Sequence, residues 1–190
     1  MTQLIHTLIL IYGFATAEFT TAAPDVLQEE KPPVVTGELV QRGVRFFQPG
    51  SETPFTGVLL TRHKNGKKAK ESTYKAGLRH GKATDWYENG NKIWEGSFKN
   101  NLVDGKMISY WENGQKARES WDKDGLSHGK DIWWHENGKK AVERNFKNGE
   151  EHGKFETWYK NGQKSSEWNF EEGEAVGREL RWDENGVKKK

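Results

Sequence analysis

The sequence predicts an all-β fold in which short strands form a thin antiparallel β-meander of hairpin repeats. The first observation is an Asn-Gly dipeptide that recurs every 24 residues without insertion. Because Asn and Gly tolerate the positive φ of tight turns, this dipeptide between two β-rich runs is a strong hairpin signal. The predicted structural turns are Asn65-Gly66, Asn89-Gly90, Asn113-Gly114, Asn137-Gly138, Asn161-Gly162 and Asn185-Gly186.

The second observation is a marker glycine that keeps the same 24-residue step. Each repeat then contains two short strands, one after the marker glycine, as in residues 153–159, and one after Asn-Gly, as in residues 164–170. A second turn, as in residues 147–153, reverses the chain again, so all strands are expected to run antiparallel. The marker glycines are Gly57, Gly81, Gly105, Gly129, Gly153 and Gly177.

The composition is too polar for a thick globular core, since 33% of the 190 residues are apolar and 31% are charged. Nine tryptophans and 21 glycines instead suit a thin sheet that buries large aromatic side chains between neighbouring repeats. A net charge of only +2 argues against strong non-specific binding of nucleic acid. The absence of cysteine excludes disulfides, thiolate nucleophiles and Cys-based metal sites.

The N-terminal segment is typical of a secretory signal peptide over residues 1–17. An apolar run from Leu4 to Phe14 is too short to span a bilayer and precedes the small-residue pattern Ala15-Thr16-Ala17. We therefore expect a secreted or periplasmic protein. The alternatives are a disordered or weakly anchored N-terminus and a cytoplasmic location. Residues 18–37 contain three prolines and no sustained periodicity, which predicts a flexible lead-in.

Residues 38–56 predict a cap at the first edge of the array. Two short strands are expected around Arg42-Gly43, followed by a loop over residues 48–54. Terminal units of repeat proteins are usually atypical, because they cover an edge that internal repeats bury against each other. Residues 57–190 then form six repeats, of which the last is truncated.

Two columns of aromatic residues recur at 24-residue spacing, and they help to predict which side chains point to the same face of the sheet. A three-residue loop ending in a left-handed glycine would place Trp134 with Val142 and Phe146, whereas a two-residue turn would separate them. Burial favours the first arrangement. In the third repeat, Trp121 stands one position early and Asp122 occupies the column, which predicts a local bulge or kink. The columns are Trp86, Tyr110, Trp134, Trp158 and Trp182, and Tyr74, Phe98, Phe146 and Phe170.

The repeat unit, clearest in residues 81–104 and 129–152, resembles the MORN repeat in its bacterial variant. Together with the preceding segment over residues 49–57, the chain is similar to the YwqK-type antitoxin family of toxin-antitoxin systems. The resemblance covers residues 38–190. It implies an elongated, twisted single-layer sheet of MORN-type hairpins, contact with protein or phospholipid, and no catalysis.

The residues themselves also argue against an enzyme, and no cofactor or metal is predicted. His80, His128 and His152 recur at steps of 24 or 48 residues, so they should lie roughly 10 or 20 Å apart on the sheet, too far to share one metal ion. They are expected to shape turns, and His63 and His135 to pack beside the tight turns. Equivalent glutamates are also spaced by roughly 10 Å, and no nucleophile elbow, phosphate loop or dinucleotide fingerprint appears.

The predicted function is a non-enzymatic repeat scaffold that binds a protein or peptide along an aromatic, charge-laddered sheet face. Exposed aromatic rows usually mark a binding surface, although these side chains could instead only cover one another and the glycine backbone. The candidate partner-binding residues are Trp86, Tyr110, Trp134, Trp158, Trp182, Trp94 and Trp168.

Two alternatives remain at this point. One is an antitoxin or immunity-type partner that neutralises a toxin, as the family resemblance implies. The other is a peripheral membrane protein whose lysine rows bind phospholipid headgroups. Lysines and glutamates nearly cancel along the predicted sheet, so only a weak anionic-lipid contact is expected.

Overall fold

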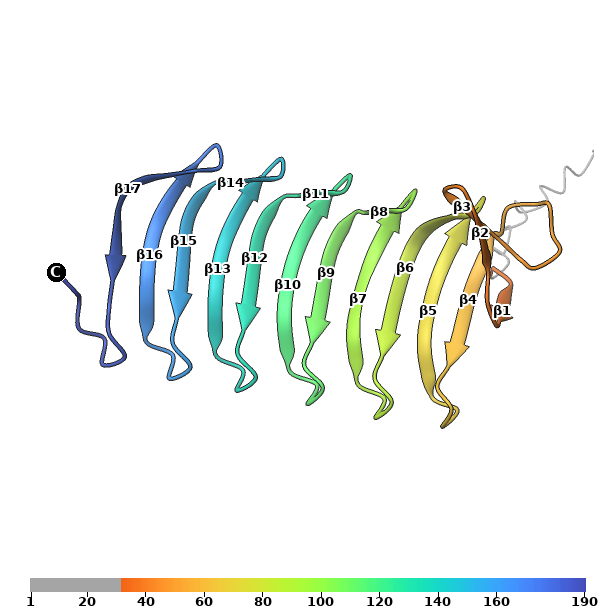
Figure 1. Ribbon diagram of the computed structural model, residues 1–190, viewed down its shortest axis with the longest axis horizontal. Coiled ribbons are helices and arrows are strands. Elements are labelled where there is room, and N and C mark those ends of the chain that lie inside the picture. The colour runs from red at the N-terminus through yellow and green to blue at the C-terminus, as the bar shows by residue number, and fades with distance from the viewer. Residues whose placement is uncertain (1–31) are drawn as a thin grey trace, which may run out of the picture. The chain divides into compact units, whose positions relative to one another are not determined.

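The computed structural model describes residues 32–190 and shows one long, open sheet of hairpins with no helix in this range (Figure 1). The all-β antiparallel meander predicted from the repeats is therefore confirmed. Its strands follow the order β1-β4-β5-β6-β7-β9-β10-β12-β13-β15-β16-β17, with β8, β11 and β14 as short additions. The predicted signal peptide and residues 18–31 of the predicted lead-in lie outside the described residues.

The strands of the array have nearly constant lengths, because each repeat contributes the same two runs. The longer strands are β4 (Gly57–Arg62), β5 (Lys68–Lys75), β6 (Leu78–Trp86), β7 (Lys92–Lys99), β9 (Gly105–Tyr110), β10 (Lys116–Lys123), β12 (Gly129–Trp134), β13 (Lys140–Lys147), β15 (Gly153–Trp158), β16 (Lys164–Glu171) and β17 (Glu174–Arg181). The short strands are β8 (Leu102–Val103), β11 (Leu126–Ser127) and β14 (Glu150–Glu151).

The first edge of the array is covered by β1 (Val34–Thr36), which pairs with β4 in parallel. The sequence assigned these residues to the flexible lead-in over residues 18–37, so that prediction is wrong for Val34–Thr36. Three consecutive β-branched residues favour an extended conformation, and the unpaired edge of β4 supplies their hydrogen-bond partners.

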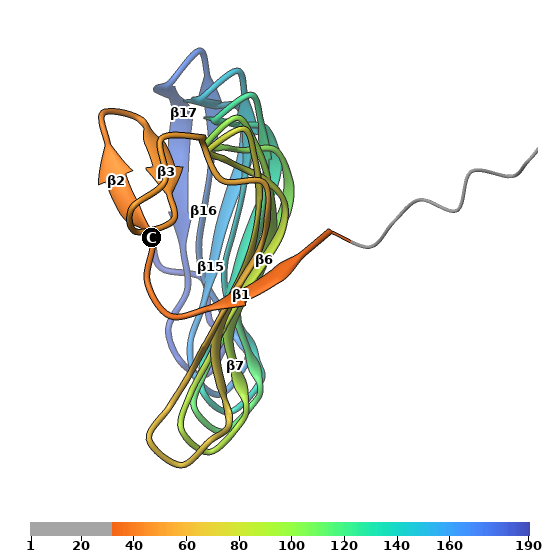
Figure 2. The same ribbon diagram turned by 90° about the vertical axis from the view of Figure 1, so that its right-hand side faces the viewer.

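Residues 38–56 contain the hairpin of β2 (Val40–Arg42) and β3 (Arg45–Phe47) and a loop that returns to the array. Phe46 and Phe55 pack against Tyr74, with ring centroids 5.3 and 5.7 Å away. We call the sheet face that carries Tyr74 the hairpin face, and the opposite face the lysine face. Figure 2 shows the sheet curving around the hairpin, so the hairpin face is concave.

The tight turn of each repeat is a three-residue loop, as predicted. At His135, the backbone N–H donates to the carbonyl of Lys139, and the N–H of Gly138 donates back to the His135 carbonyl. Gly138 has φ of 80°, the left-handed conformation that this loop requires. The Asn137 side chain closes the turn, because its Oδ1 accepts the backbone N–H of Lys139 at 3.1 Å.

The same asparagines also join successive repeats. Asn137 Nδ2 donates 2.7 Å to the carbonyl oxygen of Lys160, in the next tight turn. Five asparagines make this bond, each across 23 residues, and they form what we call the asparagine ladder. Its members are Asn65, Asn89, Asn113, Asn137 and Asn161, bonded to the carbonyls of Glu88, Glu112, Glu136, Lys160 and Glu184.

The predicted side-chain faces are wrong, because each hairpin contains an additional bulge. Trp134 lies opposite Lys140, but Trp133 lies opposite Val142, so Ala141 is left unpaired. This one-residue offset places Val142 and Phe146 on the face of Trp133 and moves Trp134 to the other face. The corresponding residue in the other repeats is Ala69, Ile93, Ala117 or Ser165.

The third repeat keeps a regular register where the sequence predicted a bulge or kink. Trp121 pairs with Lys106 and Asp122 with Gly105, in step with the rest of β9 and β10. Trp121 simply points to the lysine face, where the Lys106 ammonium lies 5.1 Å from its ring centroid. Asp122 accepts a hydrogen bond from Ser127 Oγ at 3.3 Å, so a polar pair replaces the aromatic contact of the other repeats.

The asparagine ladder predicts a position-dependent loss of stability. We expect Asn137→Ala to lower the free energy of unfolding by about 1–3 kcal/mol, because it removes a turn acceptor and an inter-repeat donor. Asn185 is the matched control: it stands at the same place in the last turn, and no hydrogen bond of its side chain occurs within residues 32–190. Asn185→Ala should cost less than about 0.5 kcal/mol in urea denaturation. Equal losses in the two variants would contradict a role for the ladder.

Candidate functional site

The lysine face carries the five-residue aromatic column that the sequence proposed for partner binding. Cross-strand pairing places Trp86 opposite Lys92, Trp134 opposite Lys140 and Trp158 opposite Lys164. The column therefore lies among the repeated lysines and glutamates, where all five of its rings are half-buried. Its members are Trp86, Tyr110, Trp134, Trp158 and Trp182.

Lysine side chains cover four of the five rings of this column. The Lys140 ammonium lies 4.8 Å from the ring centroid of Trp158 and 2.5 Å from Glu143 Oε2. Lys68, Lys116 and Lys164 cover Trp86, Trp134 and Trp182 in the same way, at 5.4–5.6 Å. Each of these lysines is thus engaged by both an aromatic ring and a glutamate three residues later. The rings already serve packing inside the sheet.

The fifth column member, Tyr110, is held by a hydrogen bond instead. Its hydroxyl donates 2.6 Å to Glu95 Oε1, and Lys92 forms an ion pair with the same carboxylate at 2.7 Å. Burial and this hydrogen bond raise the pKa of Tyr110 to about 12. On Glu95, the hydrogen bonds from Lys92 and Tyr110 lower the pKa. The lysine face is therefore a network of satisfied charges.

The hairpin face carries the remaining two predicted residues, Trp94 and Trp168. Trp168 stacks on Phe155 with centroids 4.3 Å apart, and Phe170 packs against both. Trp94 lies edge-on to Phe98 at 6.1 Å. Unlike the four tryptophans of the lysine-face column, Trp94 and Trp168 have no cation over them within residues 32–190. The structure thus separates the seven candidate residues onto two faces.

One continuous row crosses the hairpin face through successive cross-strand pairs. We call it the transverse row, and its centre is Trp94, Ser109, Arg118, Trp133 and Val142. Trp133 is 40% exposed, an unusual value for a tryptophan in the middle of a sheet. The whole row is Thr61, Lys70, Asp85, Trp94, Ser109, Arg118, Trp133, Val142, Thr157, Ser166 and Arg181.

A buried ionic cluster lies beside the centre of this row. Asp131 is only 1% exposed and accepts hydrogen bonds from Arg118 Nε at 2.6 Å, Arg144 Nε at 2.9 Å and Trp133 Nε1 at 3.1 Å. Arg144 also pairs with Glu151 at 2.8 Å. Burial opposes ionisation of Asp131, but the three donors outweigh it and hold its pKa below the ordinary value.

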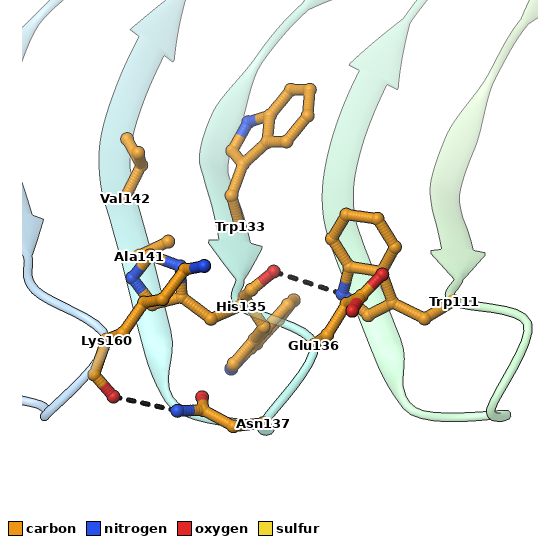
Figure 3. Close-up of a pocket in the computed structure, with 9 residues that line it drawn as sticks. Trp111, Trp133, His135, Glu136, Asn137, Ala141, Val142 and Lys160 are labelled. Carbon is orange, nitrogen blue, oxygen red and sulfur yellow. Dashed lines mark hydrogen bonds between the residues drawn. The ribbon is translucent and has the colours of Figure 1, made fainter.

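A pocket of about 660 Å³ opens between the tight turns and Trp133 (Figure 3). Trp111, Ala141 and Val142 give it apolar walls, and Lys160 lies at its rim. Trp111 is fixed by a hydrogen bond from its Nε1 to the carbonyl of Trp134 at 3.2 Å. His63 and His135, which the sequence predicted to pack, hydrogen-bond through Nε2 to the carbonyls of Trp86 and Trp158.

The sequence interpretation missed Arg118, Asp131, Arg144 and Trp133 as a group, although the repeats contain a signal for it. The aromatic, lysine and glutamate columns of the lysine face repeat the same residue types, whereas the positions of the transverse row and the position of Asp131 on the hairpin face change from repeat to repeat. Asp131, for example, stands where Leu59, Ala83, Met107 and Phe155 occur in four other repeats, and the truncated last repeat has Glu179 there. A charged residue at a position that is apolar in the first, second, third and fifth repeats marks this place as different.

Within residues 32–190, no group of three or more histidine, aspartate or glutamate side chains is arranged to hold a metal ion. In the same range, the structure has no helix with the length and apolar character needed to cross a membrane.

Comparison with protein families finds the MORN repeat variant in four segments of the chain. The matched residues are 79–100, 103–120, 127–148 and 151–172. These segments extend from β6 to β16 and include the ionic cluster of Asp131. No curated protein matches the chain.

The depressed pKa of Asp131 predicts how acid affects this cluster. Its ion pairs stabilise the fold at pH values above the ordinary aspartate pKa of 3.8, and this contribution is lost as the pH falls through the lower folded-state pKa. We therefore expect Asp131→Asn to be less stable than the wild type at pH 6, and the difference to shrink between pH 4 and pH 2. Urea midpoints across this range measure it. A constant difference would show that the charge of Asp131 contributes nothing.

Proposed function

We propose that the chain is a non-enzymatic repeat scaffold and that a protein or peptide partner binds to the concave hairpin face. The MORN-variant repeats support a scaffold role. The observation that carries the choice of face is the different state of two adjacent tryptophans. Trp133 is exposed on the hairpin face, while Trp134 is half-buried under Lys116 on the lysine face. This proposal moves the binding surface away from the column Trp86 to Trp182.

The variation between repeats supports the same choice. Residues that recur in every repeat make turns, ion pairs and ring contacts, which every repeat needs in order to stack. Residues that differ between repeats give each part of the hairpin face its own chemistry, with Trp94 and Trp133 on different strands of the transverse row and Trp168 beside this row on β16. A surface of this kind can recognise one particular partner rather than any repetitive ligand.

The paired charges of the lysine face argue against binding to a phospholipid surface, and this favours a protein partner. Its lysines form close ion pairs, including Lys92 with Glu95 at 2.7 Å and Lys130 with Glu143 at 2.7 Å. A lipid headgroup would have to compete with a carboxylate already in place, and each lysine contributes only about 1 kcal/mol to binding an anionic membrane. The proposed partner could be a toxin that binds to the hairpin face and is neutralised there. Identification of the partner decides between a toxin and another protein.

The adjacent tryptophans give a matched test of the proposal. The full chain, Trp133→Ala and Trp134→Ala are immobilised, checked for folding by circular dichroism, and used to capture proteins from extracts of the cells that make the chain. We expect a protein retained by the wild type to be lost from Trp133→Ala and retained by folded Trp134→Ala. The Trp134 variant should have the lower melting temperature, since a more deeply packed ring is removed and its cost is about 2–4 kcal/mol.

Two results would contradict this assignment. A protein retained equally by Trp133→Ala and the wild type would exclude Trp133 from the interface. A protein lost only from folded Trp134→Ala would place the interface on the lysine face.

A further inference from the structure

Arg118 occupies the centre of the hairpin face and differs from its counterparts in other repeats. The equivalent positions hold Lys70, Trp94, Val142 and Ser166, and the truncated last repeat has Lys190 there. In the transverse row, Arg118 lies between Ser109 and Trp133, and its guanidinium carbon is 4.7 Å from the ring centroid of Trp133. Its side chain is 34% exposed. A planar guanidinium thus stacks on an exposed tryptophan where solvent can reach it.

The Arg118 guanidinium is held by a hydrogen bond from its Nε. Its Nε donates to Asp131 Oδ1 at 2.6 Å, and Asp131 is itself held by Trp133 and Arg144. Within residues 32–190, no hydrogen bond or ion pair involves Nη1 or Nη2 of Arg118. The terminal nitrogens, which bind carboxylates in a bidentate way, are therefore preorganised and have no partner in the described part of the chain.

The other cations of the transverse row already have acidic partners. Lys70 pairs with Asp85 at 3.7 Å, and Arg181 pairs with Glu179 at 2.8 Å. Arg144, beside the row, is shared between Asp131 and Glu151. Asp131 is nearly inaccessible to solvent, whereas the Arg118 side chain is partly exposed. At this point of the cluster, a partner therefore meets the positive charge of the Arg118 guanidinium. Charge complementarity then favours an anionic group on the partner.

The surroundings of Arg118 favour a peptide as the source of that anion. Trp94 and Trp133 stand on either side of Ser109 and Arg118, three strand spacings or about 14 Å apart. On the far side of Trp133, the pocket with Ala141 and Val142 offers space for an apolar side chain.

We propose that Arg118 binds the carboxylate of an aspartate or glutamate in an extended segment of the partner, while a neighbouring apolar side chain enters the pocket beside Trp133. This inference rests on the proposed function and specifies the chemistry of the partner. The stacked Trp133 ring keeps the guanidinium in place before binding, so little side-chain freedom is lost when the carboxylate arrives.

Selection from a random decapeptide library displayed on phage tests this inference on the full chain. The wild type should enrich peptides that share an acidic residue next to a large apolar residue. The most enriched peptide is then synthesised, together with a version in which the acidic residue is replaced by its amide. Affinities are measured for the wild type, Arg118→Gln and Arg181→Gln. The last variant is a matched control, because Arg181 lies in the same row with its charge already paired.

We expect Arg118→Gln to weaken binding of the acidic peptide by about 10- to 100-fold, the usual range for a hydrogen bond to a charged group. Arg181→Gln should stay within about twofold of the wild type, as for other changes outside the contact. The amide peptide should bind the wild type as weakly as the acidic peptide binds Arg118→Gln. Combining both changes should cause no further loss, since they remove the same interaction.

The outcomes that overturn the inference differ from those that overturn the proposed function. Enriched peptides without a shared acidic residue, or additive losses from the two changes, would overturn the role of Arg118 and leave a binding face in place. No enrichment, or enriched peptides that bind Trp133→Ala as tightly as the wild type, would overturn both. Arg118-dependent binding to phosphatidylglycerol vesicles, with no peptide selected, would replace the peptide with a lipid.

Discussion

The fold depends on hydrogen bonds that join each tight turn to the next. In every tight turn except the last, an asparagine accepts a backbone N–H of its own loop through Oδ1 and donates from Nδ2 to the following turn. An aromatic or histidine side chain beside it, such as Tyr87 or His135, bonds to a backbone carbonyl of the next repeat as well. A bond that always spans the same number of residues tolerates no insertion, which accounts for the strict period of the sequence.

Because of this fixed step, equivalent residues of successive repeats form rows along the sheet. The rows on the two faces have different chemistry. On the lysine face, identical residues recur and satisfy one another, as in the ion pairs of Glu143 with Lys130 and Lys140. These ion pairs and the ring contacts beside them join neighbouring repeats on that face. The hairpin face varies along the transverse row and beside it, where it contains both the exposed Trp133 and the buried charge of Asp131.

The sequence was sufficient for the architecture, because turns and periodicity are local. Asn-Gly spacing predicted the hairpins, and the three-residue loop has the predicted geometry at Asn137-Gly138. The faces could not be predicted, since the unpaired Ala141 has no sequence signature of its own and one extra residue reverses every assignment beyond it. The third repeat shows the same limit. Its sequence predicted a bulge or kink at Trp121, but the register is regular and Trp121 lies on the lysine face.

The site was only partly accessible from the sequence for a related reason. Repetition drew attention to the aromatic column of Trp134 and Trp158, which the structure places under lysines. The less regular residues, Arg118 and Asp131, come from different strands, and their contact is known only once β10 and β12 are paired. Under the proposed function, departures from the repeat are better indicators of recognition than the repeat itself.

Hydroxyl-radical footprinting of the wild-type chain with its captured partner tests this division of the two faces most directly. Oxidation is measured for individual tryptophans by mass spectrometry, with and without the partner. We expect protection of Trp133 and Trp94 on the hairpin face, and unchanged oxidation of Trp134 and Trp158 on the lysine face. Protection of Trp134 and Trp158 with no change at Trp133 would show that the repeated column is the binding surface and would contradict the account.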